Sequence, residues 1–174
     1  MNRHLLVILI FGACVSSCSQ RIYVVRHAEK LEDRQPGPST MMRTDPELSE
    51  AGRVRALNLR DLLESRHIRY IFSTGYRRTE ATVRPLSEYV GIPITYYRND
   101  SLQDFIDRIR SIRRGNVLIV GHSNTVDDII NGICQTRQIA SDLPESEYDR
   151  LFVIKRKGKR THFSESRYGY PSNP

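Results

Sequence analysis

Short apolar runs alternate along the chain with longer segments in which apolar residues recur every three or four positions. The runs Ile22–Val25, Tyr70–Phe72 and Val117–Val120 are apolar throughout, which is typical of strands that are buried on both faces. Helical segments separate these strands, and this alternation predicts an α/β fold. We expect a three-layer sandwich with a mostly parallel central sheet and helices on both faces.

Two of the predicted helices connect these strands. The first covers residues 49–66, with Ser49 as its N-cap. The second covers residues 77–90, is interrupted at Pro85 and ends at Gly91, a residue type that commonly terminates helices. Each helix lies between two strands, as the crossover connection of a parallel sheet requires.

The second half of the chain predicts two more helices and a hairpin. Ser101 and Asp104 have the spacing of a capping box and open the third helix. The fourth helix follows Gly121. Two further apolar and alternating runs, Leu151–Ile154 and Thr161–Arg167, predict a terminal β-hairpin.

The amino-terminal segment has the pattern of an export signal. Its apolar run, Leu5–Val15, is shorter than the roughly 20 residues that a transmembrane helix needs. Residues 15–18 resemble a bacterial lipobox, which implies a signal peptide over residues 1–17 and lipidation of Cys18; a plain secretory signal is the alternative. We therefore expect a lipid-anchored protein on the periplasmic side of a bacterial envelope. Ser19, rather than an Asp, favours the outer membrane in a Gram-negative host.

Length and charge narrow the picture further. The 174 residues suit a single domain, here 18–170, with residues 171–174 as a loose tail and the Pro-containing segment 35–46 as a loop. The net charge of +7 suits an anionic ligand, a nucleic acid or an acidic membrane. No recognition-helix or aromatic-interleaved basic pattern supports nucleic-acid binding. The basic run 155–160 indicates a solvated hairpin tip or, alternatively, a contact with anionic lipid headgroups.

Cationic residues follow the predicted strands at the point where each strand ends. Arg26 and His27 follow the first strand, Arg78 the second and His122 the third. The carboxyl ends of parallel strands meet at one edge of a sheet, so these side chains are expected to converge. Converging cations repel one another unless an anion lies between them, and arginine forks fit phosphate oxygens. The sequence predicts a phosphate site.

The same residues carry a resemblance to a known family. Arg26–Glu29 is a variant of an Arg-His-Gly-Glu signature, and Leu48–Ala56 matches a Leu-Ser-x-x-Gly-x-x-Arg-Ala block. Ser73–Thr82 and Gly121–Ser123 match two further blocks in the same order. In these four blocks the chain resembles branch 1 of the histidine phosphatase superfamily, the phosphoglycerate-mutase-like enzymes.

The resemblance implies a mechanism that needs neither a metal nor a cofactor. His27 would attack phosphorus and form a phosphohistidine, which water then hydrolyses. Arg26, Arg78 and His122 would hold the phosphoryl oxygens. The expected activity is hydrolysis of phosphate monoesters or other phosphoryl compounds, with a small phosphorylated molecule or a phosphoprotein as substrate. A non-catalytic member that binds phosphorylated ligands is the alternative.

Three further side chains are candidates for proton donation or substrate binding in this scheme. Asp100 is the candidate proton donor, because it is the only carboxylate in the segment where larger family members carry their acid. Glu29 and Ser123 are candidate substrate-binding residues, although Ser123 could instead cap the following helix. Arg55 is expected to form a structural ion pair, and Arg77 to lie at the rim.

Overall fold

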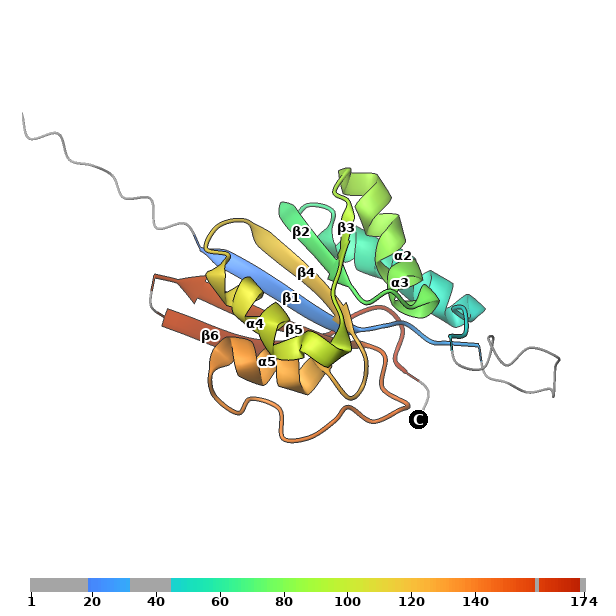
Figure 1. The fold of residues 1–174 in the computed structure, drawn as a ribbon. Coiled ribbons are helices and arrows are strands. Elements are labelled where there is room, and N and C mark those ends of the chain that lie inside the picture. Colours follow the sequence, from blue (N-terminus) through green and yellow to red (C-terminus); the bar gives the residue numbers. More distant parts are fainter. Residues whose placement is uncertain (1–18, 32–44, 159, 173–174) are drawn as a thin grey trace, which may run out of the picture.

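A six-stranded sheet lies at the centre of the computed structural model, which describes residues 19–31, 45–158 and 160–172 (Figure 1). The predicted signal peptide, Cys18 and most of the 35–46 loop lie outside the described residues. The strands are β1 (Gln20–Arg26), β2 (Ile68–Ser73), β3 (Ile94–Tyr96), β4 (Asn116–Gly121), β5 (Arg150–Lys157) and β6 (Arg160–Arg167).

The strand order is β3-β2-β4-β1-β5-β6. β1, β2, β3 and β4 are parallel to their neighbours in this group, whereas the terminal hairpin β5–β6 pairs antiparallel with β1. The predicted fold class, a mostly parallel α/β sandwich, is confirmed. The parallel arrangement places the ends of β1, β2 and β4 at one edge of the sheet.

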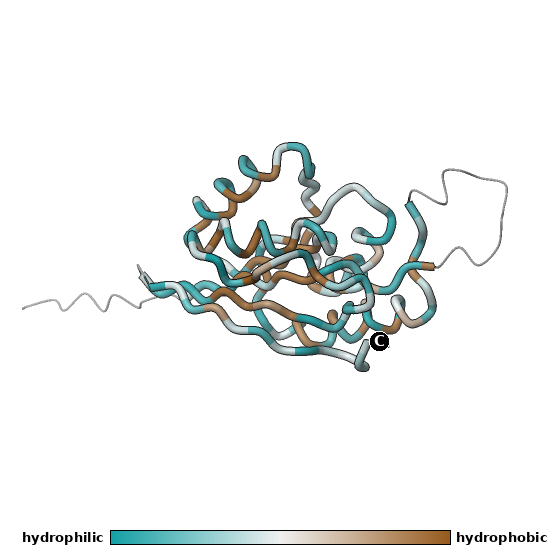
Figure 2. Tube along the Cα trace, turned by 90° about the horizontal axis from the view of Figure 1, so that it is seen from below, coloured by the Kyte–Doolittle hydropathy of each residue, from teal (hydrophilic) through white to brown (hydrophobic). Residues whose placement is uncertain are grey.

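Helices cover both faces of the sheet. α2 (Glu50–Leu63) and α3 (Arg77–Val90) lie on one face, and α4 (Leu102–Ser111) and α5 (Val126–Cys134) lie on the other (Figure 1). Figure 2 shows the hydrophobic positions gathered along the central strands and the hydrophilic positions on the outside. Within the described residues, no helix combines the length and apolar character needed to cross a membrane.

The structure corrects the predicted extent of one helix and the predicted interruption of another. α2 ends at Leu63, before the predicted end at residue 66. α2 begins after Ser49, whose side chain accepts a hydrogen bond from Gly52 N, as predicted for an N-cap. The second helix is not interrupted: α3 continues through Pro85. Its neighbours Val83 and Leu86 are fully buried, so packing holds the helix where the proline removes a hydrogen bond.

Three other expectations also need correction. Ser101 does not form a capping box, because its hydroxyl donates to Asp100 Oδ1 (3.3 Å) instead of capping α4. The edge strand β3 was not predicted. The predicted loose tail is attached to the fold at Ser172, because Ser172 Oγ accepts hydrogen bonds from Tyr148 N (2.8 Å) and Asp149 N (3.0 Å).

Candidate active site

The carboxyl edge of the sheet brings together two histidines that are far apart in the sequence. In the parallel pair β1–β4, Arg26 is opposite Gly121, and His27 N donates to Gly121 O (3.0 Å). His27 and His122 therefore follow adjacent strands, with ring centroids 5.5 Å apart. Both side chains are buried. The predicted convergence of these two residues is confirmed.

His27 has the protonation state of a nucleophile. Its Nδ1 lies 2.8 Å from Ala28 O, and a carbonyl oxygen only accepts, so Nδ1 carries the proton and Nε2 keeps its lone pair. Burial lowers the pKa of His27 to about 3; the Ala28 contact opposes this shift, and the cations Arg26 and Arg78 add to it. The ring is therefore neutral at pH 7, as attack on phosphorus requires.

His122 is held between a cation and a hydroxyl. Arg78 Nη2 donates to Nδ1 (3.3 Å), because a guanidinium has no acceptor, and Nε2 lies 3.0 Å from Thr74 Oγ1. Burial lowers the pKa of His122 to about 4, with further lowering by Arg78 and Arg26. In this arrangement His122 is neutral until an anion enters between it and the arginines.

Arg26 is buried beneath the loop that precedes β5. Its Nη1 donates to the carbonyl oxygens of Pro144 (2.9 Å), Glu145 (2.9 Å) and Glu147 (3.3 Å), and its Nη2 forms a 2.7 Å ion pair with Glu145 Oε2. The guanidinium lies 4.1 Å from the centre of the Tyr148 ring. Among the described residues, Arg26 Nε is buried without a hydrogen-bond partner. A buried N–H in this state favours an anionic ligand.

Arg78 is anchored beside a carboxylate and an aromatic ring. Its Nη1 lies 3.3 Å from Asp45 Oδ1, and its guanidinium lies 4.5 Å from the centre of the Tyr76 ring. Burial lowers the pKa of Arg78, and Asp45 opposes this shift. Arg77 points elsewhere and pairs with Glu47, so the prediction that it is a rim residue is confirmed.

Ser123 contacts a carboxylate of the site and does not cap a helix. Its hydroxyl donates to Glu145 Oε1 (2.5 Å), whereas α5 has Thr125 as its N-cap. Glu145 therefore connects Ser123 with Arg26, and Lys30 lies 3.9 Å away. This contact with Ser123 is the largest cause of the lowered pKa of Glu145. The sequence analysis missed Glu145, because no regular pattern surrounds it.

Asp100 is not brought to the two histidines. Its carboxylate forms an ion pair with Arg98 and is mostly exposed. The hydrogen bond from Arg98 lowers the pKa of Asp100. Within the described part of the chain, no contact joins Asp100 to His27 or His122.

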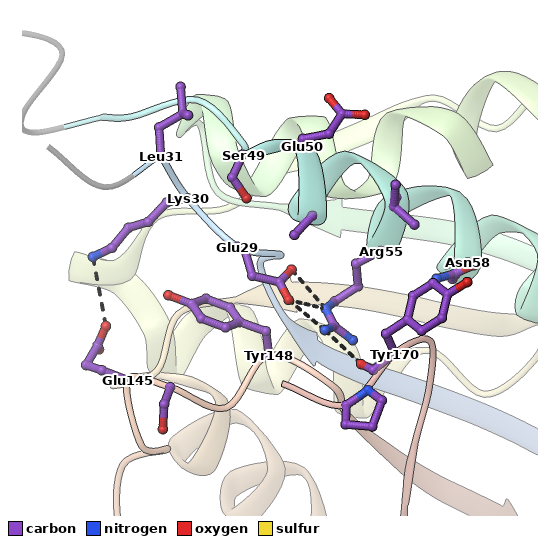
Figure 3. Close-up of a pocket in the computed structure, with 14 residues that line it drawn as sticks. Glu29, Lys30, Leu31, Ser49, Glu50, Arg55, Asn58, Glu145, Tyr148 and Tyr170 are labelled. Carbon is purple, nitrogen blue, oxygen red and sulfur yellow. Dashed lines mark hydrogen bonds and ion pairs between the residues drawn. The ribbon is translucent and has the colours of Figure 1, made fainter. Parts of the chain in front are cut away.

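Glu29 lines a large cavity (Figure 3), and Tyr148, which also lines it, has its ring centre 6.0 Å from that of His27. The cavity has a volume of about 1060 Å³, and Glu145 and Tyr148 form the side nearest to Arg26. Glu29 points toward Arg55, whose Nη2 lies 2.6 Å from Glu29 Oε1. Arg55 also donates to Tyr168 O (2.9 Å) and Tyr170 O (3.0 Å). The prediction of a structural ion pair for Arg55 is confirmed.

The site is built from histidine, arginine and hydroxyl groups, with the carboxylates Glu145 and Asp45 paired to the arginines. In residues 19–31, 45–158 and 160–172, no group of three or more His, Cys, Asp and Glu side chains is placed to hold a metal ion. Two neutral histidines and two arginines, one of them with a buried Nε–H, are suited to bind a phosphoryl group, so the candidate site is of the phosphate-binding class.

Comparisons with known proteins agree with this class. The family model of the histidine phosphatase superfamily (branch 1) matches residues 22–100, which include β1, α2, β2 and α3. Over these residues the chain matches the histidine phosphatase superfamily, and the phosphatase structures described below share its fold. No curated protein sequence matches the chain.

Solved structures show the same fold at low sequence identity. SixA from Agrobacterium tumefaciens, a phosphohistidine phosphatase candidate, is 22% identical with a TM-score of 0.59, over 87% of this chain and 98% of that one. An α-ribazole-5'-P phosphatase candidate from Escherichia coli is 14% identical with a TM-score of 0.60, over 85% and 96%. Phosphoserine phosphatase from Entamoeba histolytica is 10% identical with a TM-score of 0.58, over 87% and 97%.

Proposed function

We propose that this protein is a metal-independent phosphatase that works through a phosphohistidine on His27. One observation carries the proposal: His27 is buried and neutral, and its Nδ1 rather than its Nε2 is engaged by Ala28 O. The Nε2 lone pair is thus the one available for attack, and the ring lies beside His122 and near Arg26 and Arg78. This tautomer is the nucleophilic form of imidazole. A module that only binds phosphorylated ligands needs the cations but not the tautomer, so catalysis is favoured over binding alone.

The first step transfers the phosphoryl group to the protein. The lone pair of His27 Nε2 forms a bond to phosphorus while the bond from phosphorus to the leaving-group oxygen breaks and its electron pair stays on that oxygen. Arg26, Arg78 and His122 stabilise the charge on the phosphoryl oxygens. In the second step a water oxygen bonds to phosphorus, the P–N bond breaks with its pair returning to Nε2, and the water proton leaves with inorganic phosphate.

Glu145 is the better candidate for the proton donor than Asp100. In the free protein Glu145 pairs with Arg26 and accepts from Ser123, in the place where a phosphoryl oxygen would bind. A phosphoryl group that takes over these partners removes the counter-charge of the carboxylate. The loss of these partners and the added phosphoryl charge both raise the pKa of Glu145, which favours its role as the donor to the departing oxygen. Asp100 has no comparable link to the site.

The substrate is proposed only by chemical class: a small phosphorylated molecule or a phosphoprotein. The cavity of about 1060 Å³ that reaches His27 through Tyr148 has room for a leaving group larger than a simple alcohol. We also propose export and lipidation at Cys18, on the lipobox-like residues 15–18. Cys18→Ser should release the protein from the membrane fraction or leave it unprocessed, and unchanged membrane attachment of this variant would contradict the assignment.

The test of the phosphatase function uses the chain without residues 1–17. The parent should hydrolyse aryl phosphate in the presence of a chelator and, after rapid acid-free denaturation, retain base-stable, acid-labile phosphate on His27. His27→Ala should lose both properties. His162→Ala, which removes an exposed histidine of β6, should retain both. Hydrolysis by His27→Ala at the parent rate would eliminate the mechanism.

A further inference from the structure

The edge of the sheet opposite the active site has nine basic residues and few acids. β1, β2 and β4 begin at this edge, and antiparallel β5 ends there, because Gln20 pairs with Arg156 and Arg21 with Lys155. We call the segments 19–21, 64–69, 113–116, 155–158 and 160–162 the amino-edge surface. Its basic residues are Arg21, Arg66, Arg69, Arg113, Arg114, Lys155, Arg156, Lys157 and Arg160.

Acidic residues are almost absent from this surface. Glu64 is the one carboxylate in the segments that define it. By contrast, the arginines on the outer sides of α2 and α3 pair with acids, as Arg53 does with Glu50 and Arg84 with Glu80. The net charge of +7 is therefore concentrated at one end of the molecule. A field of this kind attracts an anionic partner.

One part of the amino-edge surface is hollowed and lined by cations. A cavity of about 430 Å³ lies between the end of α4 and the hairpin. Its lining includes Arg110, Arg113 and Arg156, against one carboxylate, Asp107, which pairs with Arg110 (3.0 Å). Arg156 Nη1 is fixed by Ile109 O (3.4 Å) and Ile112 O (3.3 Å). Burial lowers the pKa of Arg156, and Arg113 and Arg110 lower it further, so these cations act on one another. An anionic group would relieve this repulsion.

We propose that the amino-edge surface docks against a bilayer that contains anionic lipids. A membrane is favoured over other anionic partners because the chain enters β1 at this surface (Figure 1), and the lipidation site proposed at Cys18 is two residues before the start of β1. The inference adds an orientation to that anchor. With this surface on the headgroups, His27 lies at the other end of β1, about 20 Å from the membrane-facing end of the strand. The candidate active site then faces away from the membrane.

The experiment separates the surface from the anchor. A chain that begins at Ser19 contains every element described above and lacks Cys18, and its circular dichroism should match that of the longer chain. It is sedimented with vesicles of phosphatidylcholine alone and of phosphatidylcholine with phosphatidylglycerol. We expect binding to the anionic vesicles only, and loss of that binding as salt rises and screens the charges.

A triple variant tests which cations are responsible. Each basic residue near an anionic surface strengthens binding about fivefold, so Arg113→Gln/Arg114→Gln/Lys155→Gln should weaken vesicle binding on the order of 100-fold. The matched control is Arg53→Gln/Arg60→Gln/Arg84→Gln. It removes the same charge from α2 and α3 and should weaken binding far less.

Circular dichroism should show that both variants are folded. No readout depends on turnover, so a failure of the membrane proposal leaves the phosphatase proposal untouched. Equal weakening by the two triple variants would overturn the proposal, because net charge alone would then explain the binding. Equal binding to neutral vesicles would also overturn it. Tighter binding to duplex DNA than to anionic vesicles at the same salt, or displacement from vesicles by millimolar inorganic phosphate, would replace the membrane with another partner.

Discussion

The two buried histidines should make the protein sensitive to mild acid. An unfolded histidine has a pKa near 6.5, whereas His27 and His122 are held at about 3 and about 4 in the folded chain. Between pH 6.5 and these values the unfolded chain binds more protons than the folded one. Folding stability therefore falls as the pH drops below 6.5, and the histidines cost nothing above that pH.

The size of the effect follows from the two pKa values. Lowering the pH from 7 to 5 charges both histidines in the unfolded chain and neither in the folded chain. Each histidine then removes about 2 kcal/mol from the free energy of unfolding, or about 4 kcal/mol together. That loss is a large share of the total stability of a small domain, which is roughly 5–15 kcal/mol.

Urea unfolding at pH 7 and pH 5, in buffers without phosphate, measures this loss. The variants His27→Gln and His122→Gln should each reduce it by about half, because glutamine does not titrate. The difference between the two pH values cancels any constant effect of a substitution, and comparing that difference with the parent's cancels the contributions of other titrating groups. His162→Gln, at an exposed position of β6, should change nothing. The reasoning is refuted if His27→Gln and His122→Gln lose as much stability between the two pH values as the parent.

Further predictions concern the packing around the site and its proton donor. A Cβ at Gly52 would lie 2.2 Å from Glu29 O, so Gly52→Ala should lower the free energy of unfolding by about 1–3 kcal/mol in urea titrations. Arg55→Ala leaves Glu29 without its partner and should cost about 3 kcal/mol or more by the same assay. Glu145→Gln should slow alkyl phosphate hydrolysis about 10²- to 10⁴-fold and aryl phosphate hydrolysis little, whereas Asp100→Asn should leave both unchanged. An Asp100→Asn variant that loses alkyl activity selectively would restore Asp100 as the donor.

Local sequence was sufficient for most of the secondary structure. The apolar runs of β1, β2 and β4 are recognisable because strands covered on both faces exclude polar residues. Ser49 and Gly91 mark helix ends for local reasons. The Ser49 side chain accepts a hydrogen bond from the first turn of α2, and Gly91 adopts the left-handed conformation that ends α3. Pro85 was misleading, since its local cost is outweighed by packing of the residues beside it.

Part of the candidate site was equally accessible. His27, His122 and Arg78 follow apolar runs, and parallel strands necessarily bring their carboxyl ends to one edge. The amino-edge surface follows from the same rule applied to the other ends of the strands. In both cases residue order along the chain, together with the direction of each strand, determines which side chains meet.

The tertiary structure alone decided which groups complete the site. Glu145 and Tyr148 belong to an irregular segment, and they reach Arg26 because its buried guanidinium needs the carbonyl oxygens of that segment. Asp100 was assigned by its position in the sequence, yet the turn before α4 places it beside Arg98. Sequence determines elements through local backbone and burial preferences, whereas the place of a loop side chain depends on long-range partners that no local pattern encodes.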